Sequence, residues 1–292
     1  LLDTVERHAI DCTPEHTGEL NVAVTPWQVE GLTESAAAHR DHGMEATLLD
    51  AAQTRAQVDS PTYLAGLWRR DGVVLVDPAR LAWGLRSAAE GLGVRFFDRS
   101  PVRSLRTETD GDHPAVRIRT DGGSVVADRA VVATNAFRSP VRQISRYVVP
   151  VYDHVLVTEP LSEAQRASVG WSGRQGLSDV GNQFHYYRLT PDDRILWGGW
   201  DALYHFGNRV GPALEQSPTT SRTLARHFFE TFPQLEGLRF THRWGGPIAT
   251  TSRFTCAWGT SHGGQVAWAA GYTGLGVGAS RFGARVALDL VD

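Results

Sequence analysis

Apolar and polar residues alternate along this chain in ways that predict both strands and helices. Residues 18–25 alternate with a period of two, which is typical of a strand, whereas residues 28–42 and 49–58 carry the spacing of helices. The clearest helix start is Asp77-Pro78, because an aspartate caps exposed amides and a proline suits the first helical position. Apolar residues then repeat at helical spacing as far as a pair of glycines, which are typical helix ends.

After that helix the pattern changes mainly to short strands. Residues 130–134 are continuously apolar, which is typical of a strand buried on both faces. Residues 148–200 have mostly strand patterns, and Pro191-Asp192-Asp193 predicts the turn of a hairpin. Further strands are expected at 94–97, 102–107, 115–120, 124–126, 240–244, 254–258 and 265–270, and further helices at 221–232 and 279–290. This order predicts a mixed α/β (α+β) fold.

The composition narrows the classes of function. The chain has 292 residues, of which 41% are hydrophobic and 21% charged, which suits one large or two ordinary domains with a sizeable core. A net charge of −3 argues against nucleic acid as a partner. All 29 basic residues are arginines, and the absence of lysine excludes Schiff-base, pyridoxal-phosphate, kinase and Walker-loop chemistry.

Signals of location are few. Cys12 and Cys256 are too widely separated for a disulfide framework or a zinc motif, so we expect a reducing, cytoplasmic compartment. The longest apolar stretches have only the length of strands, so we expect no membrane span. The chain begins inside an expected helix and without an initiator methionine, from which we expect a piece of a longer protein.

The segment 265–290 carries the most chemical information, because a buried strand runs into the sequence GYTGLGVG and then into a helix. Glycines let a ligand approach the backbone closely, and a helix start offers unpaired amides and the positive end of a dipole. Such a loop binds a phosphate or an electron-rich ring edge. A plain packing turn explains the same spacing equally well. The GxGxxG dinucleotide fingerprint is absent from the chain.

Two other motifs favour a structural interpretation. Residues 259–263 match GxSxG, but a strand follows where a hydrolase needs a helix, and no histidine comes later to complete a triad. His39 and His42 lie near the end of an expected helix with only Glu45 close in sequence, which predicts a solvated face and no metal site.

Aromatic and histidine side chains gather on the expected strands between residues 152 and 204. Alternation sends half of them to each face of a sheet, and one face could hold an amine against aromatic rings. Ordinary packing in a core and at its rim is the alternative. The candidates for a catalytic pocket are Tyr152, His154, Tyr186 and Tyr187, with Arg188 beside them.

Six segments in order resemble the D-amino-acid-oxidase-like flavoprotein family, which includes glycine oxidase, sarcosine oxidase and the γ-glutamylputrescine oxidases. They are residues 76–105, 125–137, 152–161, 186–200, 232–246 and 269–290, and the last three are most similar to the γ-glutamylputrescine oxidase branch. The resemblance implies an FAD-binding domain over 77–143 and 244–292. It implies a substrate domain with an antiparallel sheet over 1–76 and 144–243. It also implies that the GxGxxG segment that opens the family's nucleotide domain is missing here.

The resemblance assigns a set of residues to the cofactor. The FAD-binding positions it implies are Val102, Ala133, Thr134, Asn135, Trp244, Gly245, Gly246, Gly271, Tyr272, Thr273, Gly274, Leu275, Gly276 and Val277. Val102 would meet the adenine, and the loop 271–277 would hold the pyrimidine edge of the flavin. Leu275 stands where many members of the family carry a histidine.

One departure from the family pattern bears on the substrate. Ile248 stands where amino-acid oxidases of the family carry the arginine that grips the substrate carboxylate. A two-point contact with a carboxylate needs a guanidinium, so we expect an amine without a carboxylate at the reacting carbon, unless Arg188, Arg243 or Arg253 substitutes.

The resemblance therefore implies an FAD-dependent oxidase of a small amine, with molecular oxygen as acceptor and hydrogen peroxide as product. A flavin-dependent amino-acid dehydrogenase is one alternative. A truncated fragment or binding module without catalytic activity is the other.

Overall fold

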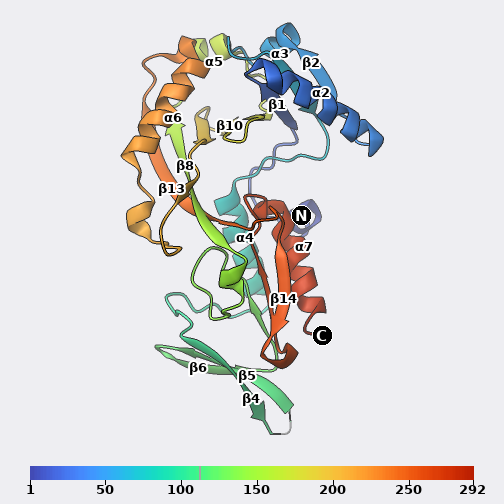
Figure 1. Cartoon of the computed structure of the whole chain (residues 1–292), viewed down its shortest axis with the longest axis vertical. Coiled ribbons are helices and arrows are strands. Elements are labelled where there is room, and N and C mark those ends of the chain that lie inside the picture. Colours follow the sequence, from blue (N-terminus) through green and yellow to red (C-terminus); the bar gives the residue numbers. More distant parts are fainter. Residues whose placement is uncertain (112) are drawn as a thin grey trace.

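The computed structural model describes residues 1–111 and 113–292, and Figure 1 shows an elongated molecule. A large sheet and its helices form the upper part, and a smaller group of helices and strands lies below it. A three-stranded meander forms the lower end. Both chain ends lie in the smaller central group (Figure 1).

The large sheet has nine strands and is mostly antiparallel, with β1 and β9 as parallel neighbours. In order across it lie β12 (Leu203–Tyr204), β8 (Val149–Thr158), β11 (Ile195–Gly199), β10 (His185–Leu189), β9 (Gly176–Asp179), β1 (Glu19–Ala23), β3 (Ala65–Arg69) and β2 (Thr47–Asp50). The long strand β13 (Phe240–Thr250) pairs with β8 over almost its whole length. The expected antiparallel sheet is therefore present.

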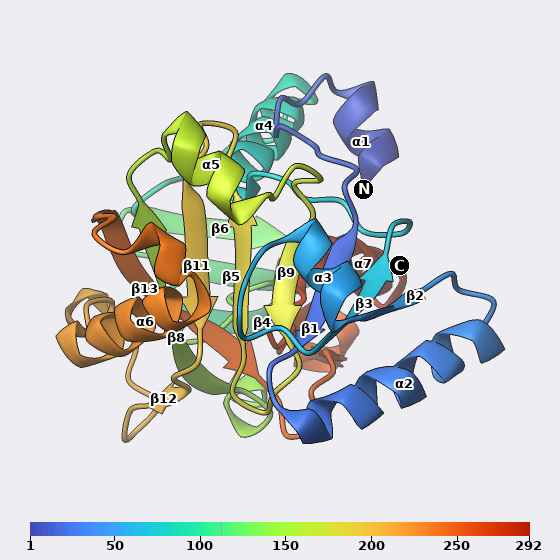
Figure 2. The ribbon, with the colours of Figure 1, turned by 90° about the horizontal axis from the view of Figure 1, so that it is seen from above.

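Helices cover both faces of this sheet unequally (Figure 2). On one face, α6 (Pro218–Thr231) and α3 (Ala51–Gln57) enclose the main core. Aromatic rings dominate this core, and those of Trp171, Tyr187, Trp197, Phe228 and Phe232 pack edge to face or stacked. Each such ring, when fully buried, contributes roughly 1.5–3 kcal/mol. On the other face, α2 (Pro26–Asp41) covers only the β1, β3 and β2 end.

The smaller group contains α4 (Pro78–Gly91), α7 (Gly276–Asp289) and a three-stranded sheet. The sheet order is β14 (Ala257–Ser261), β15 (Val266–Ala270) and β7 (Ala130–Val132), and β15 is buried along its whole length. The meander below consists of β4 (Ser104–Asp110), β5 (His113–Thr120) and β6 (Gly123–Ala127). The remaining short elements are α1 (Leu2–Arg7), α5 (Glu163–Val169) and 3-10 turns at Ile144–Arg146, Pro212–Leu214, Pro233–Leu235 and His262–Gly264.

Local signals in the sequence are confirmed where they are strong. Asp77 accepts hydrogen bonds from the amides of Ala79 at 2.9 Å and Arg80 at 3.0 Å, as predicted for the cap of α4. The GxSxG segment lies in the β14–β15 hairpin, so it is no nucleophile elbow. Among the described residues, no helix has the length and apolar character needed to cross a membrane.

Several expected elements differ from the structure. Residues 94–97 form no strand, because no neighbouring strand pairs with them and their side chains are exposed. The strand expected at 254–258 begins at Ala257, after a turn in which Phe254 has a positive φ of 54°. The helix expected over 49–58 begins at Ala51, since Leu49 and Asp50 still pair with β3. The helix α5 lies in a region expected to be mostly strands, and Ser162 caps it.

Candidate active site

The glycine loop before α7 has the geometry of a ligand-binding turn. Gly271, Thr273 and Gly274 have positive φ values of 79°, 50° and 86°, which turn the chain sharply before the helix. No side chain caps the first amides of α7, so these amides and the positive end of the helix dipole are available to an electron-rich group. Leu275, at the N-cap position, is 70% exposed.

This loop is fastened to the end of β13. The amide of Thr273 donates to the carbonyl of Ala249 at 3.0 Å, and the amide of Thr251 donates to the Thr273 hydroxyl at 3.4 Å. A Cβ on Gly271 would overlap the methyl group of Thr251. The loop is therefore held against the strand that also carries Trp244 and Ile248.

The β8–β13 register divides the predicted site residues between the two faces of the sheet. Side chains alternate along each strand, and directly opposed residues share a face. We call the face that carries Asp153, Tyr186, Gly198, Trp244 and Ile248 the open face. The opposite face lies under α6, and we call it the covered face.

Tyr152 and His154 lie on the covered face. The Tyr152 hydroxyl accepts from the amide of Gly211 at 2.9 Å, and its ring contacts His205 edge to face at 5.1 Å. The His154 side chain packs over Gly245 and is only 2% exposed. Neither ring nitrogen of His154 has a hydrogen-bond partner among the described residues. Burial lowers the pKa of His154, and the nearby charge of Asp153 opposes that shift.

Tyr187 also lies on the covered face, inside the aromatic core. Its hydroxyl and that of Tyr63 form a 2.8 Å hydrogen bond, and burial raises the pKa of both phenols. The structure therefore does not bring Tyr187 together with Tyr186, although the two are neighbours in sequence. Of the four aromatic and histidine candidates, Tyr186 is the one on the open face.

Tyr186 forms a pair with Asp153, a residue absent from the predicted site. The Tyr186 hydroxyl donates to Asp153 Oδ2 at 2.6 Å, and the amide of His154 donates to Asp153 Oδ1 at 2.8 Å. Burial raises the pKa of Asp153, while the hydrogen bond from Tyr186 works in the opposite direction. The signal in the sequence is the single carboxylate of the valine-rich strand VVPVYDHVLVT.

Arg188 is engaged in a network that ties the sheet to the segment before α4. Its guanidinium donates to Glu15 at 3.2 Å and to the carbonyl of Val76 at 3.0 Å, and Arg174 pairs with the same Glu15 at 3.0 Å. Burial lowers the pKa of Arg188, and Glu15 opposes that shift. The register places Arg243 opposite Leu156, away from the open face. These contacts leave Ile248 without a guanidinium from Arg188 or Arg243 beside it.

The predicted nucleotide-binding residues lie along the free side of the small sheet. Among the described strands, β7 pairs only with β15, and Val131 is 46% exposed. Just beyond β7, Asn135 has a φ of 50°, and the buried Thr134 hydroxyl has no hydrogen-bond partner among the described residues. Val102 is exposed before the meander. A buried hydroxyl without a partner beside an unpaired strand edge fits a bound nucleotide.

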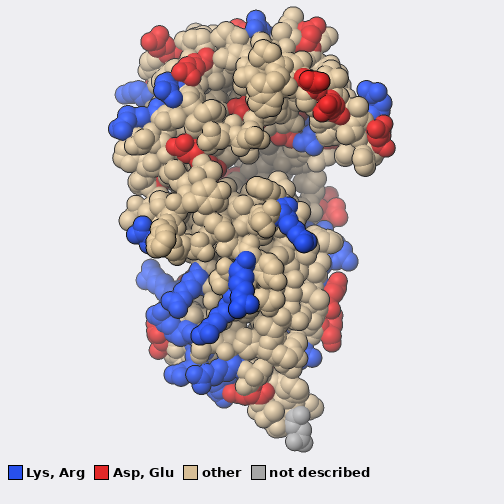
Figure 3. Space-filling view, viewed as in Figure 1, with Lys and Arg blue, Asp and Glu red and all other residues tan. Residues whose placement is uncertain are grey.

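The space-filling view shows where these residues open to the outside. Figure 3 shows a shaded recess between the upper, sheet-bearing part of the molecule and the central group. The open face of the sheet is turned toward the central group, since Arg188 on that face contacts Val76, just before α4.

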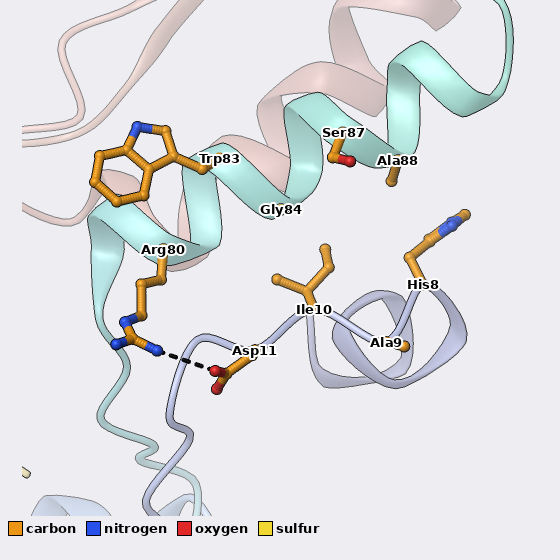
Figure 4. A pocket seen from close by; sticks show the side chains of 9 residues that line it. All are labelled: His8, Ala9, Ile10, Asp11, Arg80, Trp83, Gly84, Ser87 and Ala88. Atoms are coloured by element: carbon orange, nitrogen blue, oxygen red, sulfur yellow. Dashed lines mark hydrogen bonds and ion pairs between the residues drawn. The ribbon is translucent and has the colours of Figure 1, made fainter.

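A separate hollow of about 500 Å³ lies elsewhere, between the end of α1 and α4 (Figure 4). An ion pair of 2.9 Å joins Arg80 and Asp11 at its edge, and Ile10 packs against Gly84. It contains none of the predicted site residues.

The described residues contain no group of three or more histidine, cysteine or acidic side chains able to hold a metal ion. His39 and His42 each place a ring nitrogen against a backbone carbonyl of α2, at 2.7 Å and 2.8 Å. These bonds agree with the structural interpretation of that pair.

A small α/β unit with an uncapped helix start lies next to a large and mostly antiparallel sheet, which is the arrangement that the sequence resemblance implies for an FAD-dependent oxidoreductase. The model of the DAO family, described as FAD dependent oxidoreductase, matches residues 1–290. The chain belongs to this family, as its sequence resemblance implied.

Two curated relatives match almost the whole chain. The chain is 26% identical to the probable oxidoreductase OrdL of Haemophilus influenzae over 300 residues. It is 29% identical to the gamma-glutamylputrescine oxidoreductase of Escherichia coli over 292 residues. Each match covers 99% of this chain, and the chain spans 64% of the length of each relative.

Solved structures support the fold. Glycine oxidase from Geobacillus kaustophilus superposes with a TM-score of 0.82 at 18% identity, covering 99% of this chain and 74% of that one. L-proline dehydrogenase from P. horikoshii superposes with a TM-score of 0.77 at 17% identity, covering 94% and 71%. The expected combination of an FAD-binding type of fold with an antiparallel sheet is confirmed.

Proposed function

We propose that the protein to which this chain belongs oxidises a C–N bond of a small amine to an imine. Family membership supports an FAD-dependent oxidoreductase. The observation that carries the proposal is the fastening of the glycine loop to Ala249, one residue after Ile248 on the open face. This contact holds the loop before α7, whose free amides would bind an anion, against the strand that carries the proposed apolar substrate wall.

The residues present fit FAD at two places. The loop Gly271 to Val277 would hold the flavin edge by its backbone amides, and Ala133, Thr134, Asn135 and Val102 would flank the nucleotide. When bound, FAD supplies the acceptor for the hydride that leaves the carbon next to nitrogen. Positions Trp244, Gly245 and Gly246 on β13 remain proposed cofactor neighbours.

The open face favours an amine over an amino acid. Ile248 offers only apolar surface, and the contacts of Arg188 are directed to Glu15 and Val76. A carboxylate on the reacting carbon would therefore lose its solvation without gaining the guanidinium of Arg188 or Arg243, which costs several kcal/mol. Trp244, which is 44% exposed and lies on the same face, supplies an aromatic surface for a cationic group of the substrate.

Molecular oxygen is the proposed final acceptor, with hydrogen peroxide as the product. Oxygen uptake and peroxide formation should be measured with the FAD-loaded protein, using small primary and secondary amines against the matching α-amino acids. The proposal predicts turnover with amines and little with amino acids. Turnover of an amine with an artificial acceptor but without oxygen uptake would indicate a dehydrogenase. Failure to take up FAD would indicate a non-catalytic module.

A further inference from the structure

Asp153 is a carboxylate in the middle of a hydrophobic sheet, and none of the ion pairs formed by the described residues includes it. Its oxygens accept hydrogen bonds from neutral groups, namely the Tyr186 hydroxyl and the amides of His154 and Gly199. A partly buried carboxylate without a cation is costly to keep charged. A bound cation would offset that cost.

The surroundings of Asp153 suit a cation that arrives from the open face. Asp153 lies opposite Gly246, where a Cβ would meet no other atom within 4 Å, so the space above this pair is free. Trp244 is on the same face of the neighbouring strand, two residues from Gly246. A carboxylate beside an exposed aromatic ring is a combination that binds ammonium groups.

A carboxylate is a poor neighbour for the amine that reacts. Hydride leaves the carbon next to a neutral nitrogen, whereas a nearby negative charge favours the protonated amine. Asp153 therefore suits an ammonium group that stays charged throughout the reaction, at a distance from the reacting carbon.

The register supplies that distance. Ile248 lies opposite Val151, two residues from Asp153, which corresponds to about 7 Å along β8. The glycine loop is fastened one residue beyond Ile248. A linear molecule with its reacting end at Ile248 and its other end at Asp153 has a spacer of a few methylene groups.

We infer that Asp153, positioned by Tyr186, anchors a second ammonium group, and that the substrate class is linear diamines and amines with a similar distal cation. This inference rests on the proposed amine oxidation. It names a substrate-binding residue that neither the sequence pattern nor the family resemblance supplied.

The test compares Asp153→Asn with the unaltered FAD-loaded protein, using diaminobutane and butylamine as substrates. We expect the unaltered protein to prefer diaminobutane. The substitution should lower kcat/KM for diaminobutane about tenfold or more, mainly through KM, because a charged hydrogen bond is lost, and should change butylamine less than about twofold. Asp179→Asn is the matched control, since Asp179 is a buried carboxylate of the same sheet that pairs with His185.

Calorimetric binding of diaminobutane separates this inference from the proposed function. Binding that Asp153→Asn abolishes supports the anchor even if no amine is oxidised, in which case only the proposed oxidation fails. Equal losses for diaminobutane and butylamine, or unchanged diaminobutane binding in Asp153→Asn, would overturn the anchor and leave amine oxidation standing.

Discussion

The amide of Thr273 donates a 3.0 Å hydrogen bond to the carbonyl of Ala249. This bond joins two segments that serve different parts of the proposed reaction. Thr273 belongs to the loop whose amides would hold the flavin. Ala249 directly follows Ile248 on β13, the strand that also carries Trp244. The position of the loop is thus fixed by the same strand that lines the open face.

Gly271→Ala should displace the loop and weaken FAD binding. The added Cβ would overlap the methyl group of Thr251, and the φ of 79° disfavours any residue with a side chain. We expect FAD affinity, measured by quenching of flavin fluorescence, to fall by about tenfold or more. Gly31→Ala in α2 is the control, since its Cβ would meet nothing within 4 Å. Equal FAD affinity in both variants would contradict the assignment of the loop.

Gly245→Ala should destabilise the protein. The new Cβ would overlap the His154 ring, which is buried and cannot move aside easily, so a loss of about 1–3 kcal/mol is expected. Urea unfolding measures the change. Gly246→Ala, whose Cβ would meet no atom within 4 Å, should stay close to the unaltered stability. Adding His154→Ala to Gly245→Ala should recover part of the lost stability, because the overlapping ring is removed. If the two losses of stability simply add in the double variant, the proposed overlap between the new Cβ and the His154 ring is wrong.

His154 predicts a loss of stability in mild acid. Burial lowers its pKa in the folded state below the ordinary 6.5, so the unfolded chain binds a proton that the folded protein resists. His154 does not reduce the free energy of unfolding above pH 6.5. That free energy falls as the pH drops from 6.5, the pKa of the unfolded state, toward the lower pKa of the folded state. His227, whose pKa burial also lowers, adds to the slope. Unfolding free energies of His154→Gln should fall less steeply below pH 6.5, and an unchanged slope would contradict this origin.

Asp153→Asn should stabilise the protein when no amine is bound. The pKa of Asp153 is raised in the folded state, so the charged form carries a penalty at neutral pH that disappears as the pH falls below 3.8. Removal of the charge is expected to raise the unfolding free energy by about 1 kcal/mol at neutral pH. Thermal unfolding at neutral pH and in acid measures the difference. If Asp153→Asn were less stable than the unaltered protein at neutral pH, the charged carboxylate would stabilise the folded state, which contradicts this prediction.

The sequence was sufficient where the determining contacts are local. Asp77 and Pro78 specify the start of α4 through bonds within three residues, and Pro191-Asp192-Asp193 specifies the β10–β11 turn. Residues 94–97 show the limit of such arguments, because a strand also needs a neighbour to pair with, and the short apolar pattern could not supply one.

The site could be predicted only in part, because its faces depend on pairing between distant strands. Alternation separates Tyr186 from Tyr187 in any strand, yet which of them shares a face with Trp244 and Ile248 follows from the pairing of strands far apart in sequence. Asp153 is absent from the predicted site for the same reason, since its role depends on Tyr186, which lies across β11, and on Ile248, which lies on β13.

Anaerobic mixing of the FAD-loaded protein with a small amine tests whether the bound flavin takes electrons from the amine. The measured quantity is the visible absorption band of oxidised flavin. If the proposed oxidation is correct, an amine bleaches this band in the absence of oxygen and the matching α-amino acid does not. Admission of oxygen then restores the band with formation of hydrogen peroxide. A band that persists with every amine, or that the amino acid bleaches more readily than the amine, would contradict it.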